Sequence, residues 1–151
     1  MIVPRRRERG ASMPETAIVM AVLLALLFGV IDFGRAMYTY AFVAQLARQG
    51  ARWAIVRGSQ CTALDHCNAA SSDVQTYVQS LNEGATVASK LQVTASWSNA
   101  GCPAGSSGNA PGCVVSVNVK YPFSFMLPYL PKTGQFAQIV MSSTSQMVIS
   151  Q

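Results

Sequence analysis

The sequence predicts an α+β protein in which one long N-terminal helix packs on a small antiparallel β-sheet and crosses a membrane with its first half. Three observations predict this fold class. An uncharged apolar run covers residues 16–31, a helical pattern of apolar positions continues to about residue 57, and strictly alternating segments follow near the C-terminus. Composition agrees, since charged residues make up only 11% of the chain and its mean hydropathy is +0.28.

The net charge of +5 is concentrated before the apolar run. The first ten residues carry +3, because Arg5, Arg6, Arg7 and Arg9 stand against Glu8 alone. The rest of the chain carries seven basic and five acidic side chains, which gives +2. No cluster of basic residues interleaved with aromatic ones follows residue 10, so the basic character does not indicate a nucleic-acid partner.

The apolar run is long enough to form most of a membrane span. Thr16 to Ile31 would make roughly 24 Å of helix, and a span needs about 20 residues. We therefore expect a transmembrane segment over about residues 13–34. Because the basic residues precede it, the positive-inside rule predicts a cytoplasmic N-terminus and places the remainder of the chain on the other side of the membrane.

The same helix is predicted to continue to Arg57, with one face packed on a globular head. The apolar and small residues that recur with a helical period are Val43, Leu46, Ala47, Gly50, Ala51 and Ala54. Asp32 and Arg35 stand three residues apart, which predicts a surface ion pair at the outer membrane boundary. Tyr38, Tyr40 and Phe42 are typical of an interfacial aromatic group.

One short helix and three strands are expected in the head. Ser72 and Gln75 have the spacing of a capping box, and Val74, Tyr77, Val78 and Leu81 form an amphipathic stripe behind it. Residues 91–97 and 114–121 alternate like half-buried strands. Pro122, Pro128 and Pro131 argue against a regular central strand in the segment that follows. The uncharged, β-branched residues 136–151 predict a last strand at an edge of the sheet, available for strand addition.

The four cysteines, Cys61, Cys67, Cys102 and Cys113, all lie on the predicted outer side, where oxidation is favoured. Four cysteines allow three pairings. We favour the sequence-local one, Cys61–Cys67 and Cys102–Cys113, because each pair then brackets one turn-rich loop.

A candidate processing site precedes the apolar run. No small-x-small site of an ordinary signal peptide follows the run, whereas the Gly10–Ala11 bond is unobstructed, because glycine gives a peptidase close backbone access. Cutting there would remove the arginines and keep the helix. Glu15, a carboxylate at the mouth of an apolar run, then stands at the fifth position of the mature chain.

A basic leader, a glycine before the cut, an acid at the fifth position and an apolar helix together resemble type IV pilin-like proteins. The continuation LLFGVIDFGRAMYTY and ARQGARWA looks like the TadE-like pseudopilins of tight-adherence (Flp) pilus systems. This resemblance implies a pilin-like fold, with a leader at 1–10 that a prepilin peptidase removes, a long helix at 11–57 and a periplasmic head at 58–151. It also implies insertion in the bacterial inner membrane.

The resemblance further implies a function in assembly. The chain would be a minor pseudopilin that associates with other pilins and the pilus machinery in pilus biogenesis and surface adherence. In this class the acid at the fifth position is thought to neutralise the new α-amine of a neighbouring subunit, here Glu15 with Ala11. Two other readings remain: an uncleaved, membrane-anchored periplasmic binding protein unrelated to pili, and the main filament subunit. Subunits of Flp filaments are typically much smaller than this chain, which argues against the second.

The sequence offers no catalytic constellation. His66 is the only histidine and lies in a cysteine-bracketed loop, so neither a nucleophile–base arrangement nor a metal site is expected there. No glycine-rich phosphate loop with a lysine is present. We expect no enzyme activity, no cofactor, no metal and no small-molecule substrate.

Overall fold

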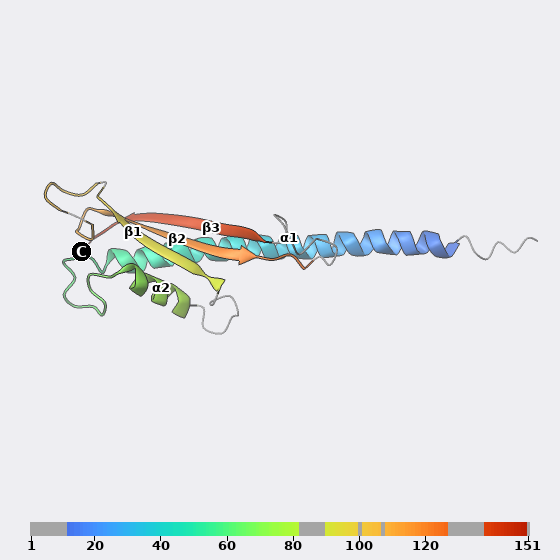
Figure 1. Ribbon diagram of the computed structural model, residues 1–151, viewed down its shortest axis with the longest axis horizontal. Coiled ribbons are helices and arrows are strands. Elements are labelled where there is room, and N and C mark those ends of the chain that lie inside the picture. The colour runs from blue at the N-terminus through green and yellow to red at the C-terminus, as the bar shows by residue number, and fades with distance from the viewer. Residues whose placement is uncertain (1–11, 82–89, 100, 107, 127–137, 151) are drawn as a thin grey trace, which may run out of the picture.

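The computed structural model describes residues 12–81, 90–99, 101–106, 108–126 and 138–150. Within them, one long helix, α1 (Ser12–Ile55), is followed by α2 (Ser71–Ser80) and the strands β1 (Gln92–Ser98), β2 (Val114–Phe123) and β3 (Ile139–Val148). The N-terminal half of α1 projects from the head as a bare helix, while its C-terminal half lies along the sheet (Figure 1). The predicted fold class is therefore confirmed.

The three strands form an antiparallel sheet in the order β1-β2-β3. Its alternation follows from the sequence, since Val115, Val117 and Val119 of β2 are buried and the residues between them are less so. Val93 pairs with Val119 and Ala95 with Val117, which continues the buried face onto β1. The strand order also places β3 at an edge, as predicted.

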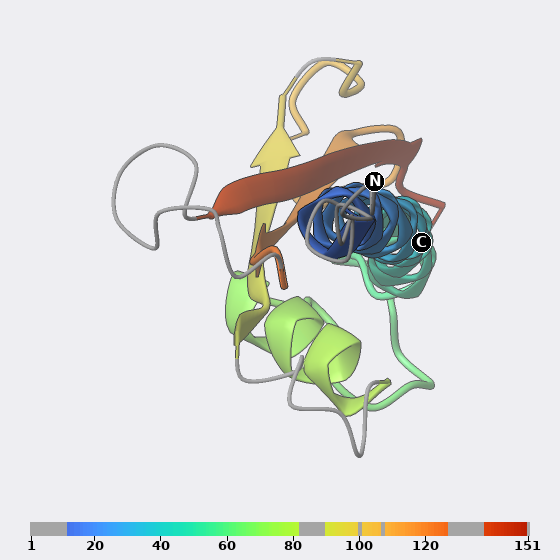
Figure 2. The same ribbon diagram turned by 90° about the vertical axis from the view of Figure 1, so that its right-hand side faces the viewer.

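Both helices cover the buried face of the sheet (Figure 2). α1 packs on β2 and β3, while α2 packs on β1 and on α1. The face of α1 that the periodicity predicts is the face that is buried, namely Val43, Leu46, Ala47, Gly50, Ala51 and Ala54. The small residues of this face let α1 pack closely against α2 and β2. A Cβ added at Gly50 would lie 2.8 Å from Cγ2 of Val78 and 3.2 Å from Cγ1 of Val117.

The prediction for the segment around Pro122 is wrong at its first two residues. β2 is the central strand and runs through Pro122 to Phe123, which pair with Val140 and Ile139 of β3. Proline is tolerated here because β1 ends its pairing at Gln92, opposite Lys120. Past that point β2 has a single neighbour, so a residue without an N–H group costs no ladder bond on the open side. Pro128 and Pro131 lie outside the described residues.

The predicted capping box of α2 is also displaced. The helix begins one residue earlier than Ser72, and the Oδ2 of Asp73 accepts a hydrogen bond of 2.8 Å from the backbone N–H of Ala70. Asp73 therefore takes the position that was assigned to Gln75. Val74 and Val78 of the predicted stripe are buried, Tyr77 is half-buried, and Leu81 is exposed.

The end of the head at the C-terminus of α1 is closed by the two residues that follow β3. The backbone N–H of Ser150 donates to the carbonyl of Ile55 at 3.1 Å, which satisfies an acceptor at the C-terminal end of α1. Ile149 is buried and exchanges backbone bonds with Gly112 and Cys113. The end of β3 is thus fixed to the end of the long helix and to the second disulfide loop.

Candidate functional site

The exposed N-terminal half of α1 is the part of the molecule with the strongest functional signal. It is the described helix that is long and apolar enough to cross a membrane, with a mean hydropathy of 2.5 over its most apolar window. Only 6% of that window is buried against the rest of the chain. Large apolar side chains point outward all around it, from Met13 through Leu23 to Ile31. Such a surface needs lipid or other helices to cover it.

Glu15 lies in the first turn of this helix, fully within its exposed part. A carboxylate at a helix N-terminus interacts favourably with the helix dipole. No hydrogen bond or ion pair of Glu15 is present among the described residues. Gly10 and Ala11, the predicted cleavage site, and the whole leader lie outside those residues.

Asp32 is placed differently from the sequence expectation. Its predicted pair with Arg35 is present, with Nη1 of Arg35 donating to Oδ1 of Asp32 at 2.9 Å. Only Arg35 of the pair is on the surface, however, because its side chain is 43% exposed while Asp32 is only 2% exposed. The chain that leaves β2 covers it, and the backbone N–H of Met126 lies 3.0 Å from Oδ2 and 3.2 Å from Oδ1.

Arg35 completes this junction between the helix and the head. Its guanidinium lies 5.5 Å from the centre of the Phe123 ring, a cation–π arrangement. Phe123 is buried and packs edge-on against Phe125 at 5.3 Å. The residues Asp32 and Arg35 thus fix the end of β2 to the helix at the point where the apolar run ends.

The two disulfides lie at the opposite, membrane-distal end. The structure joins Cys61 to Cys67 and Cys102 to Cys113. Asn109 connects the two loops, since its Nδ2 donates to Oδ1 of Asn68 at 3.1 Å and its carbonyl accepts from the N–H of Ser59 at 2.8 Å. The tip of the head is therefore one cross-linked unit.

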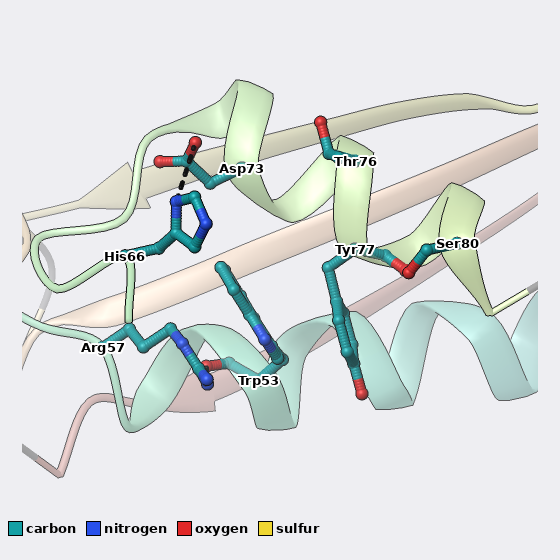
Figure 3. Close-up of a pocket in the computed structure, with 7 residues that line it drawn as sticks. All are labelled: Trp53, Arg57, His66, Asp73, Thr76, Tyr77 and Ser80. Atoms are coloured by element: carbon teal, nitrogen blue, oxygen red, sulfur yellow. Dashed lines mark hydrogen bonds and ion pairs between the residues drawn. The ribbon is translucent and has the colours of Figure 1, made fainter. Parts of the chain in front are cut away.

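A cavity of about 270 Å³ lies between the end of α1, α2 and the first disulfide loop (Figure 3). Trp53 stands in its centre, with Tyr77 stacked 5.0 Å away on one side and the guanidinium of Arg57 4.1 Å away on the other. At the rim, Nδ1 of His66 lies 3.8 Å from Oδ1 of Asp73.

Several polar side chains that line this cavity donate hydrogen bonds to backbone carbonyls of the protein itself. The hydroxyls of Thr76 and Ser80 donate to carbonyls of their own helix, at 2.9 Å and 2.8 Å. Nε of Arg57 donates to the carbonyl of Asp65, which fixes the first disulfide loop. The arrangement joins α1, α2 and that loop, and it contains no activated nucleophile. Among the described residues no cluster of three metal-ligating side chains occurs.

Sequence reasoning missed two of these features. The burial of Asp32 depends on Met126, a residue 94 positions away, and only the run DFGR, an acid and a base at the end of an apolar helix, could have drawn attention to it. The Trp53 stack combines residues of two helices. Its only sequence signal was the pair Trp53 and Arg57, which stand four residues apart on α1.

Comparison with known proteins matches this same helix. Residues 10–52 match the family model described as TadE-like protein. The N-terminal region of this chain is TadE-like. The predicted resemblance is thereby confirmed over residues 10–52, which include the apolar run and most of the helix face that packs on the head. No curated protein and no solved structure matches the chain.

The TadE-like match supports a broad functional statement. It indicates that residues 10–52 are of the kind found in proteins associated with Tad pilus systems. Together with the one apolar helix found among the described residues, it indicates membrane anchoring. The match ends at Arg52 and does not extend over the disulfide-bonded head.

Proposed function

We propose that this protein is a minor pseudopilin of a tight-adherence pilus system. A prepilin peptidase cuts between Gly10 and Ala11, which leaves α1 in the inner membrane with the head in the periplasm. Glu15 then pairs with the new α-amine of Ala11 on a neighbouring subunit. The head supplies contacts to other pilins or to the assembly machinery, and the protein thereby contributes to pilus biogenesis and adherence.

The observation that carries this proposal is the position of Glu15. It is an acid without a partner among the described residues, on a helix whose apolar side chains all around it also have no cover. Moving an unpaired charge into a bilayer costs several kcal/mol, with estimates from roughly 2.5 upward. A cationic group on a neighbouring helix removes most of that cost, and proteolysis after Gly10 would create one. The family match over residues 10–52 begins at this bond.

Processing is tested by expressing the full chain with and without a prepilin peptidase and sequencing the N-terminus of the purified protein. We expect Ala11 as the first residue only when the peptidase is present. Gly10→Val should block the cut, because a β-branched side chain obstructs the bond, whereas Ala11→Ser is the matched control that should still be cut. A mature protein that starts elsewhere, or that keeps its arginines in assembled pili, would contradict the proposal.

Assembly is tested separately with Glu15→Gln, which removes the charge and keeps the shape. We expect this variant to be processed and inserted but to crosslink poorly to other pilins. Asp65→Asn is the matched control, since it removes an exposed charge from the distal loop. The alternative function, an uncleaved anchored binding protein, predicts that Glu15→Gln behaves like the control. Immunogold labelling along the whole pilus would instead indicate the main filament subunit.

A further inference from the structure

The base of the head has a second apolar surface in addition to the span. Five large apolar side chains are exposed there: Phe33, Met37, Met126, Ile139 and Val140, here called the collar. Each is between 46% and 67% exposed. They come from α1, from the exit of β2 and from the start of β3, and these segments meet where the bare helix enters the head (Figure 1).

Hydrogen bonds and ring contacts fix the level of the collar relative to the span. Met126 bonds to Asp32 through its backbone, so it lies at the level of the first residue after the apolar run. Phe123 lies against Arg35, and Ile139 is the strand partner of Phe123. The exit of β2 and the start of β3 therefore lie within about one helical turn of the end of the span.

The thickness of a bilayer then predicts which lipid layer surrounds the collar. Residues 13–31 make roughly 28 Å of helix, which matches a hydrocarbon core about 30 Å thick. Polar headgroup layers bring the bilayer to about 40–45 Å, so each layer covers roughly three to five helical residues beyond the core. Asp32 to Ala36 thus fall within the outer headgroup layer and Met37 lies at its outer edge, while Met126 falls in the layer with Asp32.

We propose that the collar is a membrane-docking surface, so that the lipid headgroup layer contacts the head at the exit of β2 and the start of β3 as well as at α1. This inference rests on the membrane insertion of α1 in the proposed function. Lipid fits better than a protein partner because the collar is continuous with the lipid-facing span. Its side chains are apolar, like those on the faces of interfacial helices that bury into the boundary between headgroups and acyl chains.

Charge supports the same occupant. Asp32, the acid at this level, is buried and bonded to Arg35 and Met126, so its charge is turned away from lipid. Arg35 is partly exposed, and its cationic group suits lipid phosphates. The bond from Met126 thus has two consequences, since it satisfies the carboxylate and it holds an apolar side chain against the membrane surface.

The test uses the full chain in vesicles of phosphatidylethanolamine and phosphatidylglycerol, with nitroxide quenchers attached either near the headgroup or near the end of the acyl chain. Met126→Trp and Val140→Trp each place a fluorophore in the collar. The native Trp53 lies about 33 Å of helix beyond the span, and the native Trp97 pairs with Val115 close to the Cys102–Cys113 disulfide, so the two give a constant background. Met20→Trp marks the interior of the bilayer, and Ser96→Trp marks the exposed face of the sheet.

We expect both collar variants to be quenched more by the nitroxide near the headgroup than by the deep one, and Ser96→Trp by neither. Two collar positions in different segments keep the test valid if one variant misfolds. If Met20→Trp is quenched while both collar variants behave like Ser96→Trp, the docking surface is overturned and the proposed function stands. If Met20→Trp is not quenched either, membrane insertion itself fails. Protection of the collar only in the presence of other pilin subunits would assign it to a protein partner and would overturn the inference as well.

Discussion

The backbone N–H of Met126 lies 3.0 Å from Oδ2 of Asp32, and this contact joins residues 94 positions apart. It brings the end of the central strand back to the helix where the apolar run ends. Arg35 bonds to the same carboxylate and lies over Phe123, so three side chains and one backbone group determine how the head is oriented on its anchor. With α1 inserted in a bilayer as proposed, this junction, together with the packing of α1 on the sheet, sets where the head stands relative to the membrane.

Asp32→Ala should therefore loosen the junction. The substitution removes the carboxylate that accepts part-buried hydrogen bonds from the N–H of Met126 and from Arg35, and hydrogen bonds to a charged group are worth about 1.5–3 kcal/mol. Asp32→Asn should cost less, because the amide oxygen can still accept from Met126. The measurement is chemical unfolding of the detergent-solubilised protein, followed by tyrosine and tryptophan signals. Equal stability of Asp32→Ala and the unchanged protein would show that the contact does not hold the head.

Gly50 provides a sharper test of the packing between α1 and the head. A Cβ at this position would lie 2.8 Å from Val78 and 3.2 Å from Val117, two buried β-branched side chains that have little room to move. Overpacking of this kind costs about 1–3 kcal/mol, while alanine gains about 1 kcal/mol in helix propensity. We expect Gly50→Ala to be destabilising by up to about 2 kcal/mol in the same unfolding experiment.

Gly34→Ala is the matched control for Gly50→Ala. It also lies within α1, but nothing is within 4 Å of its added Cβ. The propensity gain is then unopposed, so this variant should be neutral or more stable by up to about 1 kcal/mol. If Gly34→Ala destabilises the protein as much as Gly50→Ala does, the close approach of α1 to Val78 and Val117 is not the cause.

The periodic elements were predictable from the sequence because each depends on its own residues. The buried face of α1 and the alternation of β1 and β2 are repeats that burial on one side imposes. The unusual position of Glu15 could be recognised for a similar reason, because the charged residue and the apolar run that follows it are adjacent in the sequence. The TadE-like match covers this same part of the chain.

The other features depended on distant partners. Pro122 can be part of β2 only because β1 stops opposite Lys120, which the sequence around Pro122 does not contain. Asp32 and Arg35 have the spacing of a surface pair, and the segment that returns at Met126 covers the carboxylate of Asp32. The start of α2 was misplaced for a more local reason. Several polar residues in a row could serve its first turn, and Asp73 bonds to Ala70 in place of the predicted partner.

Arg57 should stabilise the tip of the head through three side-chain contacts, one of which is a hydrogen bond of 3.3 Å from Nη1 to the carbonyl of Trp53. Its guanidinium lies 4.1 Å from the Trp53 ring, and its Nε donates to the carbonyl of Asp65 in the first disulfide loop. Arg57→Gln removes the cation–π contact, worth about 0.5–1 kcal/mol at exposed sites, and weakens the tie to the loop. We expect a loss of about 1–2 kcal/mol and a shift in Trp53 emission. Arg48→Gln is the control, since Arg48 is exposed and bonds only to Ala44 of its own helix among the contacts described.

The two disulfides should contribute to stability to a similar extent but with different consequences for structure. The bridges close loops with sequence separations of 6 and 11, for which the loop-entropy relation gives roughly 2–3 kcal/mol each. Cys113 is fully buried beside the backbone bonds that hold Ile149 and the end of β3. Cys67, by contrast, lies in a loop that Arg57 and Asn109 also hold.

Replacing Cys102 and Cys113 by alanine should therefore destabilise the whole head, whereas the same change at Cys61 and Cys67 should loosen mainly the first loop. Hydrogen exchange separates these effects. The first pair should raise exchange throughout β2 and β3, because the bonds between Ile149 and Cys113 are no longer anchored by the bridge. The second pair should raise it over residues 58–70 only. A uniform response to both pairs would show that the tip unfolds as a single unit with the sheet.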